Sequence, residues 1–198
     1  MNQKPQILLI GDSIRLGYCE NVKRELENEA EVIFPDVNCR CTAFTIESIG
    51  GWLNLCDKDR LAAVHLNCGH WDAEVFLGDG MALTPLDVYE RNIKRIFTYI
   101  KRNCPDVKLS FATTTPMNPD RETAKAIGNI SRTTDDIREY NRVGVKAAKE
   151  MGAEIDDLFT VAENWSAEAY ADFCHFTDAS NVVLGKTVAE FLRNELNK

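Results

Sequence analysis

The residue types that could perform covalent chemistry lie near the two ends of this chain. Gly11-Asp12-Ser13-Ile14 follows an apolar run near the amino terminus, and Asp172-Phe173-Cys174-His175 lies close to the carboxyl terminus. A serine hydroxyl becomes a nucleophile when a base removes its proton, and an imidazole needs a carboxylate to fix its tautomer. An Asp three residues before a His can supply that carboxylate. The pattern predicts a triad of Ser13, His175 and Asp172.

Each half of this pattern also has a simpler interpretation. A serine between a strand and a helix is commonly an N-cap, and an isolated Asp-x-x-His is commonly a surface turn. Chemistry is favoured because both halves occur together and because Ser13 is expected at a helix start, where the dipole favours developing negative charge. The motif at Gly11 is neither the GxSxG of α/β-hydrolases nor the GxGxxG of dinucleotide sites.

The elements that must position these residues alternate along the chain. Short apolar runs predict five strands, at residues 6–10, 31–34, 62–68, 107–112 and 153–156. Helical spacing predicts a helix after the first strand and further helices at 45–56, 84–103, from 133 onward and at 181–196. Strands separated by helices indicate an α/β fold: a doubly wound, flavodoxin-like three-layer sandwich with a parallel sheet of strand order 2-1-3-4-5. Residues 1–198 are predicted to form one domain, because no linker or repeat interrupts them.

This topology brings distant residues together. The carboxyl ends of parallel strands meet at one edge of the sheet, so Ser13, Asn67 and His175 are expected to converge there. Two long connections, residues 70–83 and 114–132, also follow strands and belong to the same edge. They are interpreted as segments that cover a substrate, and simple insertions are the alternative.

The motifs at both ends resemble a known family. GDSI at 11–14 and DFCH at 172–175 are similar to the first and last blocks of the SGNH hydrolases, the GDSL-like lipases and acylhydrolases. Thr113-Thr114-Thr115-Pro116 resembles the family as well. The resemblance implies a carboxylic ester hydrolase that acts through an acyl-enzyme. It implies Ser13 as nucleophile and as one oxyanion donor through its N–H, with Asp172 and His175 completing the triad.

The third block departs from the family pattern. The family usually has Gly-x-Asn-Asp after the third strand, whereas this chain has Asn67-Cys68-Gly69-His70-Trp71-Asp72. Gly69 and Asp72 fit, but Trp71 stands where the amide is expected. Asn67 is therefore predicted to donate to the oxyanion, which places the chain in a subgroup with an N-x-G-x-x-D third block.

The second block lacks the family's glycine. Residues 35–40 contain Asn38 instead, which is a second candidate oxyanion donor. Its identity as an ordinary turn residue is an equally good explanation.

The side chains expected around the site favour a small acyl group. Four residues are predicted to bind the substrate: Asp12, Gly69, His70 and Trp71. Loop packing is an equal alternative for His70 and Trp71. Because the mouth is polar and no amphipathic lid helix or apolar surface stretch is expected, an acetyl ester of a carbohydrate is favoured over a long lipid chain.

The composition of the chain limits the kinds of molecule that it is expected to bind. A formal charge of −8 argues against nucleic acid, and no apolar run approaches the roughly 20 residues of a membrane span. The seven cysteines are odd in number and form no CxxC pair, so free thiols in a reducing compartment are expected. With no signal-peptide pattern at the start, a cytoplasmic location is predicted. Neither a cofactor nor a metal is expected, because Cys39 and Cys41 lack a second ligand pair.

Two other functions use the same residues. A thioesterase or acyltransferase would employ the same triad. A non-catalytic, flavodoxin-like module would instead hold an anion at the helix start after Gly11. His65 is interpreted as a core histidine of the third strand.

Overall fold

Five parallel strands form the main sheet, and a computed structural model describes residues 3–121 and 130–198 of the protein. The strands are β1 (Gln6–Gly11), β2 (Glu31–Ile33), β3 (Leu61–Asn67), β6 (Lys108–Ala112) and β8 (Glu154–Asp156). Their order is β2-β1-β3-β6-β8, with parallel pairing throughout this sheet. The predicted order is therefore confirmed.

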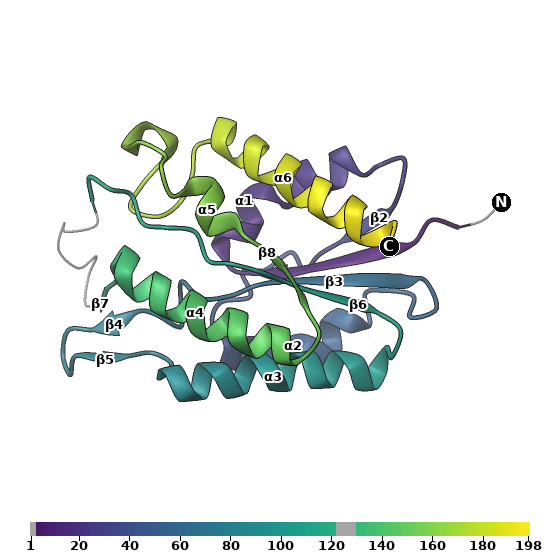
Figure 1. The fold of residues 1–198 in the computed structure, drawn as a ribbon, viewed down its shortest axis with the longest axis horizontal. Coiled ribbons are helices and arrows are strands. Elements are labelled where there is room, and N and C mark those ends of the chain that lie inside the picture. Colours follow the sequence, from purple (N-terminus) through teal and green to yellow (C-terminus); the bar gives the residue numbers. More distant parts are fainter. Residues whose placement is uncertain (1–2, 122–129) are drawn as a thin grey trace.

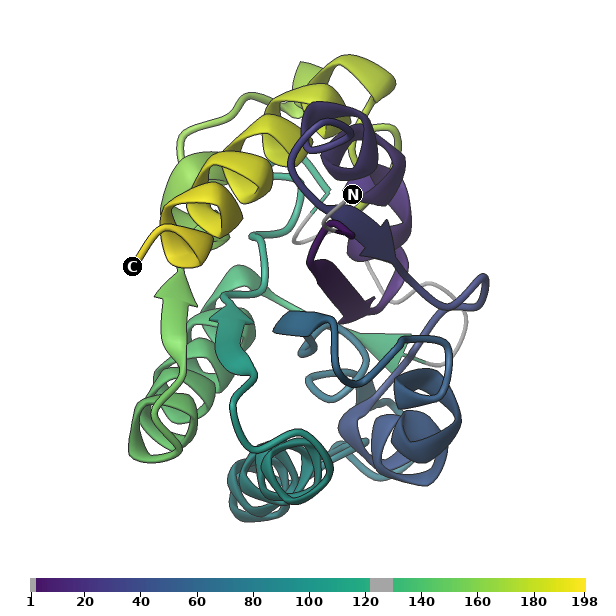
Figure 2. The same ribbon diagram turned by 90° about the vertical axis from the view of Figure 1, so that its right-hand side faces the viewer.

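Helices cover both faces of the sheet (Figure 1). One face carries α1 (Ser13–Glu25), α5 (Leu158–Ala162) and α6 (Asp178–Leu196), and the other carries α2 (Thr42–Leu53), α3 (Leu86–Asn103) and α4 (Thr134–Glu150). Figure 2, turned by 90°, shows the sheet between these two helical layers. The three-layer α/β/α sandwich is confirmed.

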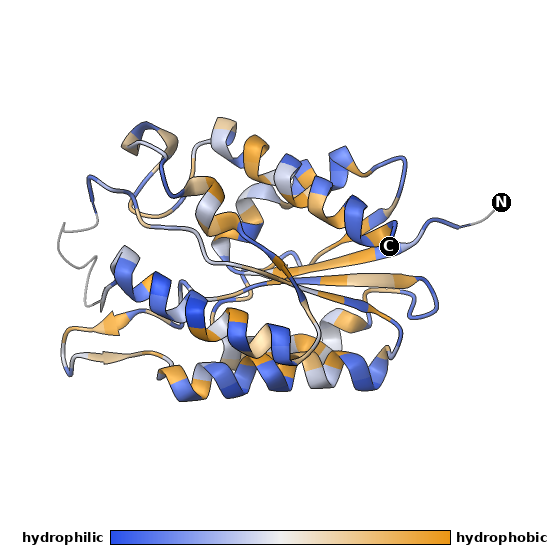
Figure 3. Ribbon diagram, viewed as in Figure 1, coloured by the Kyte–Doolittle hydropathy of each residue, from blue (hydrophilic) through white to orange (hydrophobic). Residues whose placement is uncertain are grey.

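Burial explains why the strands have continuous apolar runs. Every residue of β1 is buried, because a parallel sheet covered on both faces leaves no solvent-facing side. The helices instead turn one apolar stripe inward, as the orange and blue sides of the ribbons show (Figure 3). In α3 that stripe includes Tyr89, Ile93, Ile96 and Phe97.

Close packing of α1 against α6 connects the two ends of the chain. Gly185 of α6 lies against α1, where an added Cβ would be 2.4 Å from the Cβ of Asn21. A side chain at Gly185 would therefore push the helices apart. Since α1 begins at Ser13 and α6 begins shortly after His175, this contact helps to set the separation of those residues.

The two long connections form a second sheet. β4 (Val75–Phe76) and β5 (Met81–Ala82) make a hairpin, and β4 also pairs with β7 (Ile130–Ser131), in the antiparallel order β5-β4-β7. Figure 1 shows this small sheet beyond the end of the main sheet that carries the strands' carboxyl ends. Part of the predicted connection 114–132, residues 122–129, lies outside the described residues.

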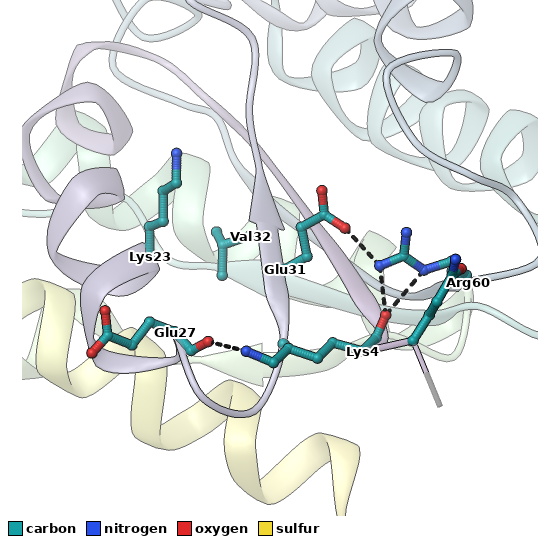
Figure 4. Close-up of a pocket in the computed structure, with 8 residues that line it drawn as sticks. Lys4, Lys23, Glu27, Glu31, Val32 and Arg60 are labelled. Atoms are coloured by element: carbon teal, nitrogen blue, oxygen red, sulfur yellow. Dashed lines mark hydrogen bonds and ion pairs between the residues drawn. The ribbon is translucent and has the colours of Figure 1, made fainter. Parts of the chain in front are cut away.

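The opposite end of the main sheet is lined by charge. Around the edge strand β2, Lys4, Lys23, Glu27, Glu31 and Arg60 surround a cavity of about 440 Å³ (Figure 4). Arg60 Nη2 lies 2.6 Å from Glu31 Oε2, and Lys4 Nζ donates to the carbonyl oxygen of Glu27 at 2.5 Å. Charged side chains of this kind discourage an edge strand from pairing with another chain.

Among residues 3–121 and 130–198, no helix is both long enough and apolar enough to cross a bilayer. All seven cysteines lie within these ranges, and each is a free thiol.

Candidate active site

Ser13 is the first residue of α1, and only Asp12 separates it from the end of β1. The N-cap is Asp12, whose Oδ1 accepts a hydrogen bond from the Ile14 N–H at 2.9 Å. The hydroxyl of Ser13 is therefore not used to cap the helix. Gly11 is needed at this junction, because an added Cβ would lie 2.9 Å from the carbonyl oxygen of Asn67.

The predicted triad residues are within hydrogen-bonding distance of one another. Ser13 Oγ lies 2.8 Å from His175 Nε2, and His175 Nδ1 lies 2.7 Å from Asp172 Oδ2. Asp172 Oδ1 accepts from the backbone N–H groups of Cys174 at 2.9 Å and His175 at 2.8 Å. Partial burial acts to raise the pKa of Asp172, but these hydrogen bonds to its charged form hold it below the usual value.

The turn that carries Asp172 and His175 is anchored to the loop after β6. The side-chain amide of Asn118 donates to the Asp172 carbonyl oxygen, and the Asn118 N–H donates to that of Phe173, both at 2.9 Å. Sequence reasoning missed Asn118, because a lone Asn after a proline-containing loop has no distinguishing spacing.

Asn67 ends β3 directly opposite Gly11. Its carbonyl oxygen accepts the Asp12 N–H at 3.2 Å, so its backbone touches the junction that carries Ser13. The residue is 1% exposed, and its side-chain Oδ1 is buried without a hydrogen-bond partner among the described residues. An amide whose acceptor oxygen has no partner among the described residues thus lies beside the nucleophile's turn.

Asn38 has a local partner. Its Oδ1 accepts from the Arg40 N–H at 2.8 Å, and Arg40 adopts a left-handed conformation with φ of 51°. These features define an Asx-type turn, which supports the turn interpretation of Asn38.

The residues predicted to bind substrate are mostly buried. His70 is 2% exposed and pairs with Thr115 Oγ1 at 3.3 Å, and burial holds its pKa well below the usual value. Gly69 is packed so closely on Thr114 that an added Cβ would be 2.1 Å from Oγ1. For His70 the structure supports the loop-packing alternative. Trp71 is partly exposed, with the Arg40 guanidinium 5.9 Å from its ring centre.

Asp72 and His65 have structural partners. Asp72 accepts from the N–H and the hydroxyl of Thr42 and so caps α2 from outside the helix. This explains why α2 begins at Thr42, before the predicted start at residue 45. His65 is fully buried and lies 2.9 Å from Asp156 Oδ2, which confirms it as a core histidine.

Two buried arginines that sequence reasoning missed hold the loops of the site. Arg132 donates to the carbonyl oxygen of His70 and to Glu74 Oε1, and it lies 3.7 Å from Cys174 Sγ. It therefore joins the loop after β3 to the His175 turn. Arg15, within α1, donates to the carbonyl oxygens of Pro35 at 3.0 Å and Val37 at 2.6 Å.

Asp12 is a buried acid beside the nucleophile. Burial raises its pKa to about 6, and its Oδ2 has no hydrogen-bond partner among the described residues. Because the folded-state pKa exceeds the ordinary value of 3.8, the native state binds more protons than the unfolded state between about pH 4 and 6. The contribution of Asp12 to stability therefore falls as pH rises through this window.

We expect Asp12→Asn to remove this pH dependence. The amide retains an oxygen that can cap α1 but never ionises, so the variant should gain stability relative to the wild type as pH rises from 4 to 7, by roughly 3 kcal/mol. Chemical denaturation at several pH values measures the difference. Asp178→Asn, at an exposed site, is the control. A pH-independent difference for Asp12→Asn would contradict the assignment.

Known proteins are similar to this chain in sequence and in fold. No family model matches the chain. A GDSL esterase/lipase of Arabidopsis thaliana is 23% identical over 96% of this chain and 86% of that protein. A GDSL esterase/lipase of rice, Oryza sativa subsp. japonica, is 22% identical over 55% of this chain, which corresponds to 44% of the rice protein's own length.

Solved structures share the fold over nearly the whole chain. The lipase/acylhydrolase from Enterococcus faecalis superposes with a TM-score of 0.76 at 18% identity, covering 96% of each chain. An acetyl xylan esterase variant from Geobacillus stearothermophilus gives 0.72 at 16% identity, covering 99% of this chain and 96% of the other. A candidate SGNH hydrolase from Slackia heliotrinireducens gives 0.67 at 17% identity, with coverages of 96% and 100%. The chain is therefore a distant relative of the GDSL esterases/lipases and has the fold of the SGNH hydrolases, as its terminal motifs predicted.

Proposed function

We propose that this protein is a carboxylic ester hydrolase in which Ser13 is the nucleophile, His175 the base and Asp172 the carboxylate that orients the base. The observation that carries the proposal is the continuous chain of contacts at 2.8 and 2.7 Å from Ser13 Oγ through His175 to Asp172. The relatives and structural neighbours described as esterases support the same class. Residues 1–198 act in this proposal as a single domain.

The proposed reaction proceeds through an acyl-enzyme. His175 Nε2 takes the proton of Ser13 as Oγ attacks the ester carbonyl carbon, and the protonated imidazole then gives that proton to the departing alcohol. A water molecule that gives its proton to His175 then attacks the acyl-enzyme. The protonated imidazole returns that proton to Ser13 Oγ, and the carboxylic acid is released. The negative oxygen of each tetrahedral intermediate is stabilised by the Ser13 N–H at the start of α1 and by the Asn67 amide.

The proposed substrate is a small-molecule or carbohydrate ester with a small acyl group such as acetyl. The polar groups at the strand ends support this choice, as does the likeness to an acetyl xylan esterase. Thioester hydrolysis and acyl transfer would proceed through the same Ser13 acyl-enzyme. A cytoplasmic location is also part of the proposal and is supported by the seven free thiols.

A fluorophosphonate probe tests the proposal directly, because only an activated serine is labelled. We expect stoichiometric labelling of the wild type, with the adduct on the peptide that contains Ser13. Ser166→Ala, at an exposed serine whose side chain caps no helix, should label like the wild type. An unlabelled wild-type protein would favour the non-catalytic module instead.

An exposed apolar hairpin supports a second candidate function. Phe76, Leu77, Met81 and Leu83, in and around β4 and β5, are 39–60% exposed. The expectation that no apolar surface stretch exists was therefore wrong. The hairpin continues from the loop that Arg132 joins to the His175 turn, and we propose that its apolar side chains contact an apolar acyl chain. This arrangement favours an esterase for medium-length acyl groups.

Acyl-chain preference distinguishes the two candidates. If the hairpin binds the acyl chain, kcat/KM should be higher for p-nitrophenyl octanoate than for the acetate, since each buried methylene contributes about 0.8 kcal/mol. The double variant Leu77→Ser/Met81→Ser should then raise KM for octanoate alone. Leu55→Ser, at a leucine after α2 that is 51% exposed, is the control. A preference for acetate that the double variant does not change would support the small-acyl substrate.

Asn67→Ala tests the oxyanion assignment. The variant should lower kcat by about 10²–10³, the usual loss for one oxyanion donor, with little change in KM. The matched variant Asn38→Ala removes only a turn contact and should cost much less. Equal losses in the two variants, or a change confined to KM, would show that Asn67 is not the donor.

A further inference from the structure

A thiol that the proposed reaction does not use lies within the catalytic turn. Cys174 Sγ is 3.8 Å from His175 Nδ1, which is itself 2.7 Å from Asp172 Oδ2. One ligand atom from each of the three residues lies within 4.8 Å of the other two. A sulfur, an imidazole nitrogen and a carboxylate oxygen are therefore grouped on a single turn.

This group matches the preferences of zinc. Zn²⁺ binds thiolate sulfur at about 2.3 Å and imidazole nitrogen or carboxylate oxygen at about 2.0–2.2 Å, in tetrahedral geometry. Such bonds place a sulfur and a nitrogen ligand roughly 3.6 Å apart, close to the 3.8 Å between Cys174 and His175. The carboxylate needs only to move away from Nδ1 to admit the ion. The side chains of His175 and Asp172 are 38% and 39% exposed, whereas Cys174 is only 2% exposed, so the ion would enter from the imidazole and carboxylate side, where water can be a fourth ligand.

The surrounding charges are balanced for such an ion. A Cys174 thiolate and the Asp172 carboxylate together neutralise Zn²⁺. The neighbouring Arg132, 3.7 Å from Sγ, is paired with Glu74 Oε1 at 3.0 Å and so adds little net positive charge. Burial outweighs the effect of Arg132 and raises the pKa of the Cys174 thiol to about 12, so the sulfur keeps its proton until a metal ion displaces it.

We infer that Zn²⁺ binds Asp172, Cys174 and His175 and thereby switches the proposed hydrolase off. In the active state the neutral imidazole carries its proton on Nδ1, facing Asp172, and Nε2 is free to accept the proton of Ser13. Zn²⁺ takes the Nδ1 position, so that proton moves to Nε2, while the Cys174 thiol releases its own proton to solvent. Nε2 then donates to Ser13 and cannot act as a base.

Only the inhibitory consequence rests on the proposed function. Metal binding by the turn does not, and the two are measured separately. Co²⁺ serves as a spectroscopic substitute for Zn²⁺, because a Co²⁺–thiolate bond produces a charge-transfer absorption band.

The experiment titrates the full-length protein with Co²⁺ and with Zn²⁺. We expect a thiolate charge-transfer band in the wild type and in Ser13→Ala, displacement of Co²⁺ by Zn²⁺, and inhibition of wild-type ester hydrolysis that EDTA reverses. Cys174→Ser keeps an oxygen that can accept from Arg132 and should therefore retain most of the basal activity. Cys174→Ser and Cys174→Ala should both lose the band, and the remaining activity of each should resist Zn²⁺ at least roughly tenfold better. Cys41→Ser, at a partly exposed thiol whose side chain caps no helix, is the matched control.

The outcomes separate the two ideas. A band that depends on Cys174 in a protein without esterase activity would support the metal site and count against the proposed function. A band that persists in both Cys174 variants, or Zn²⁺ inhibition equal in wild type and variants, would overturn the metal site and leave the esterase proposal standing. Loss of the band in Cys41→Ser would also overturn it.

Discussion

Ser13→Ala is expected to lower kcat for p-nitrophenyl acetate by at least about 10⁴-fold, with the thermal unfolding curve unchanged. The activity should fall because Ser13 Oγ is the atom that receives the acyl group. Among the described residues, no other hydroxyl lies within hydrogen-bonding distance of His175 Nε2. The fold should persist because Asp12 caps α1 and, among the described residues, the Ser13 hydroxyl has no hydrogen bond other than that with His175.

Steady-state kinetics and differential scanning calorimetry on the same preparation measure both effects. Wild-type kinetics in Ser13→Ala, at an unchanged melting temperature, would remove Ser13 from the reaction. A large fall in melting temperature would instead show that Ser13 stabilises the strand–helix junction.

Asp172→Asn is expected to lower kcat by about 10⁴-fold, mainly by changing the tautomer of His175. The amide oxygen can still accept from the N–H groups of Cys174 and His175, so the turn should keep its shape. The amide NH₂, however, would face His175 Nδ1 and favour the tautomer that carries its proton on Nε2. The base would then be unable to accept the proton of Ser13.

Asp178→Asn is the control for this variant. Asp178 is exposed and lies only three residues after His175. Asp178→Asn therefore removes one negative charge near the site, as Asp172→Asn does, without touching the imidazole. It should retain nearly full activity. Equal losses in Asp172→Asn and Asp178→Asn would mean that net charge, rather than the tautomer, controls the rate.

The main sheet was predictable because its central strands β1, β3 and β6 are buried on both faces. β1 is a run of six buried residues, and such runs alternate with helical spacing in a way that few folds allow. The convergence of Ser13 and His175 followed from topology alone, since the carboxyl ends of parallel strands lie at one edge. Catalytic residues that lie at or near the carboxyl ends of the strands can therefore be recognised from short motifs.

The supports of the site could not be predicted, because they depend on contacts between distant residues. α2 begins at Thr42 because Asp72 caps it from 30 residues away, a partner that no local pattern reveals. Arg132 and Asn118 likewise act through carbonyl oxygens, which carry no sequence signal. The two-residue strands β4, β5 and β7 are too short to show an alternating pattern.

The pairing of β4 with β7 has a consequence for exchanging loops between related hydrolases. Residues 75–76 and 130–131 come from different connections but share one antiparallel ladder, and Arg132 extends that link to Glu74. A graft that replaces only the first connection leaves the backbone donors and acceptors of Ile130–Ser131 without their complement. The two connections thus form one structural unit. A substrate preference can be transferred into this scaffold only when both segments are taken from the same related hydrolase.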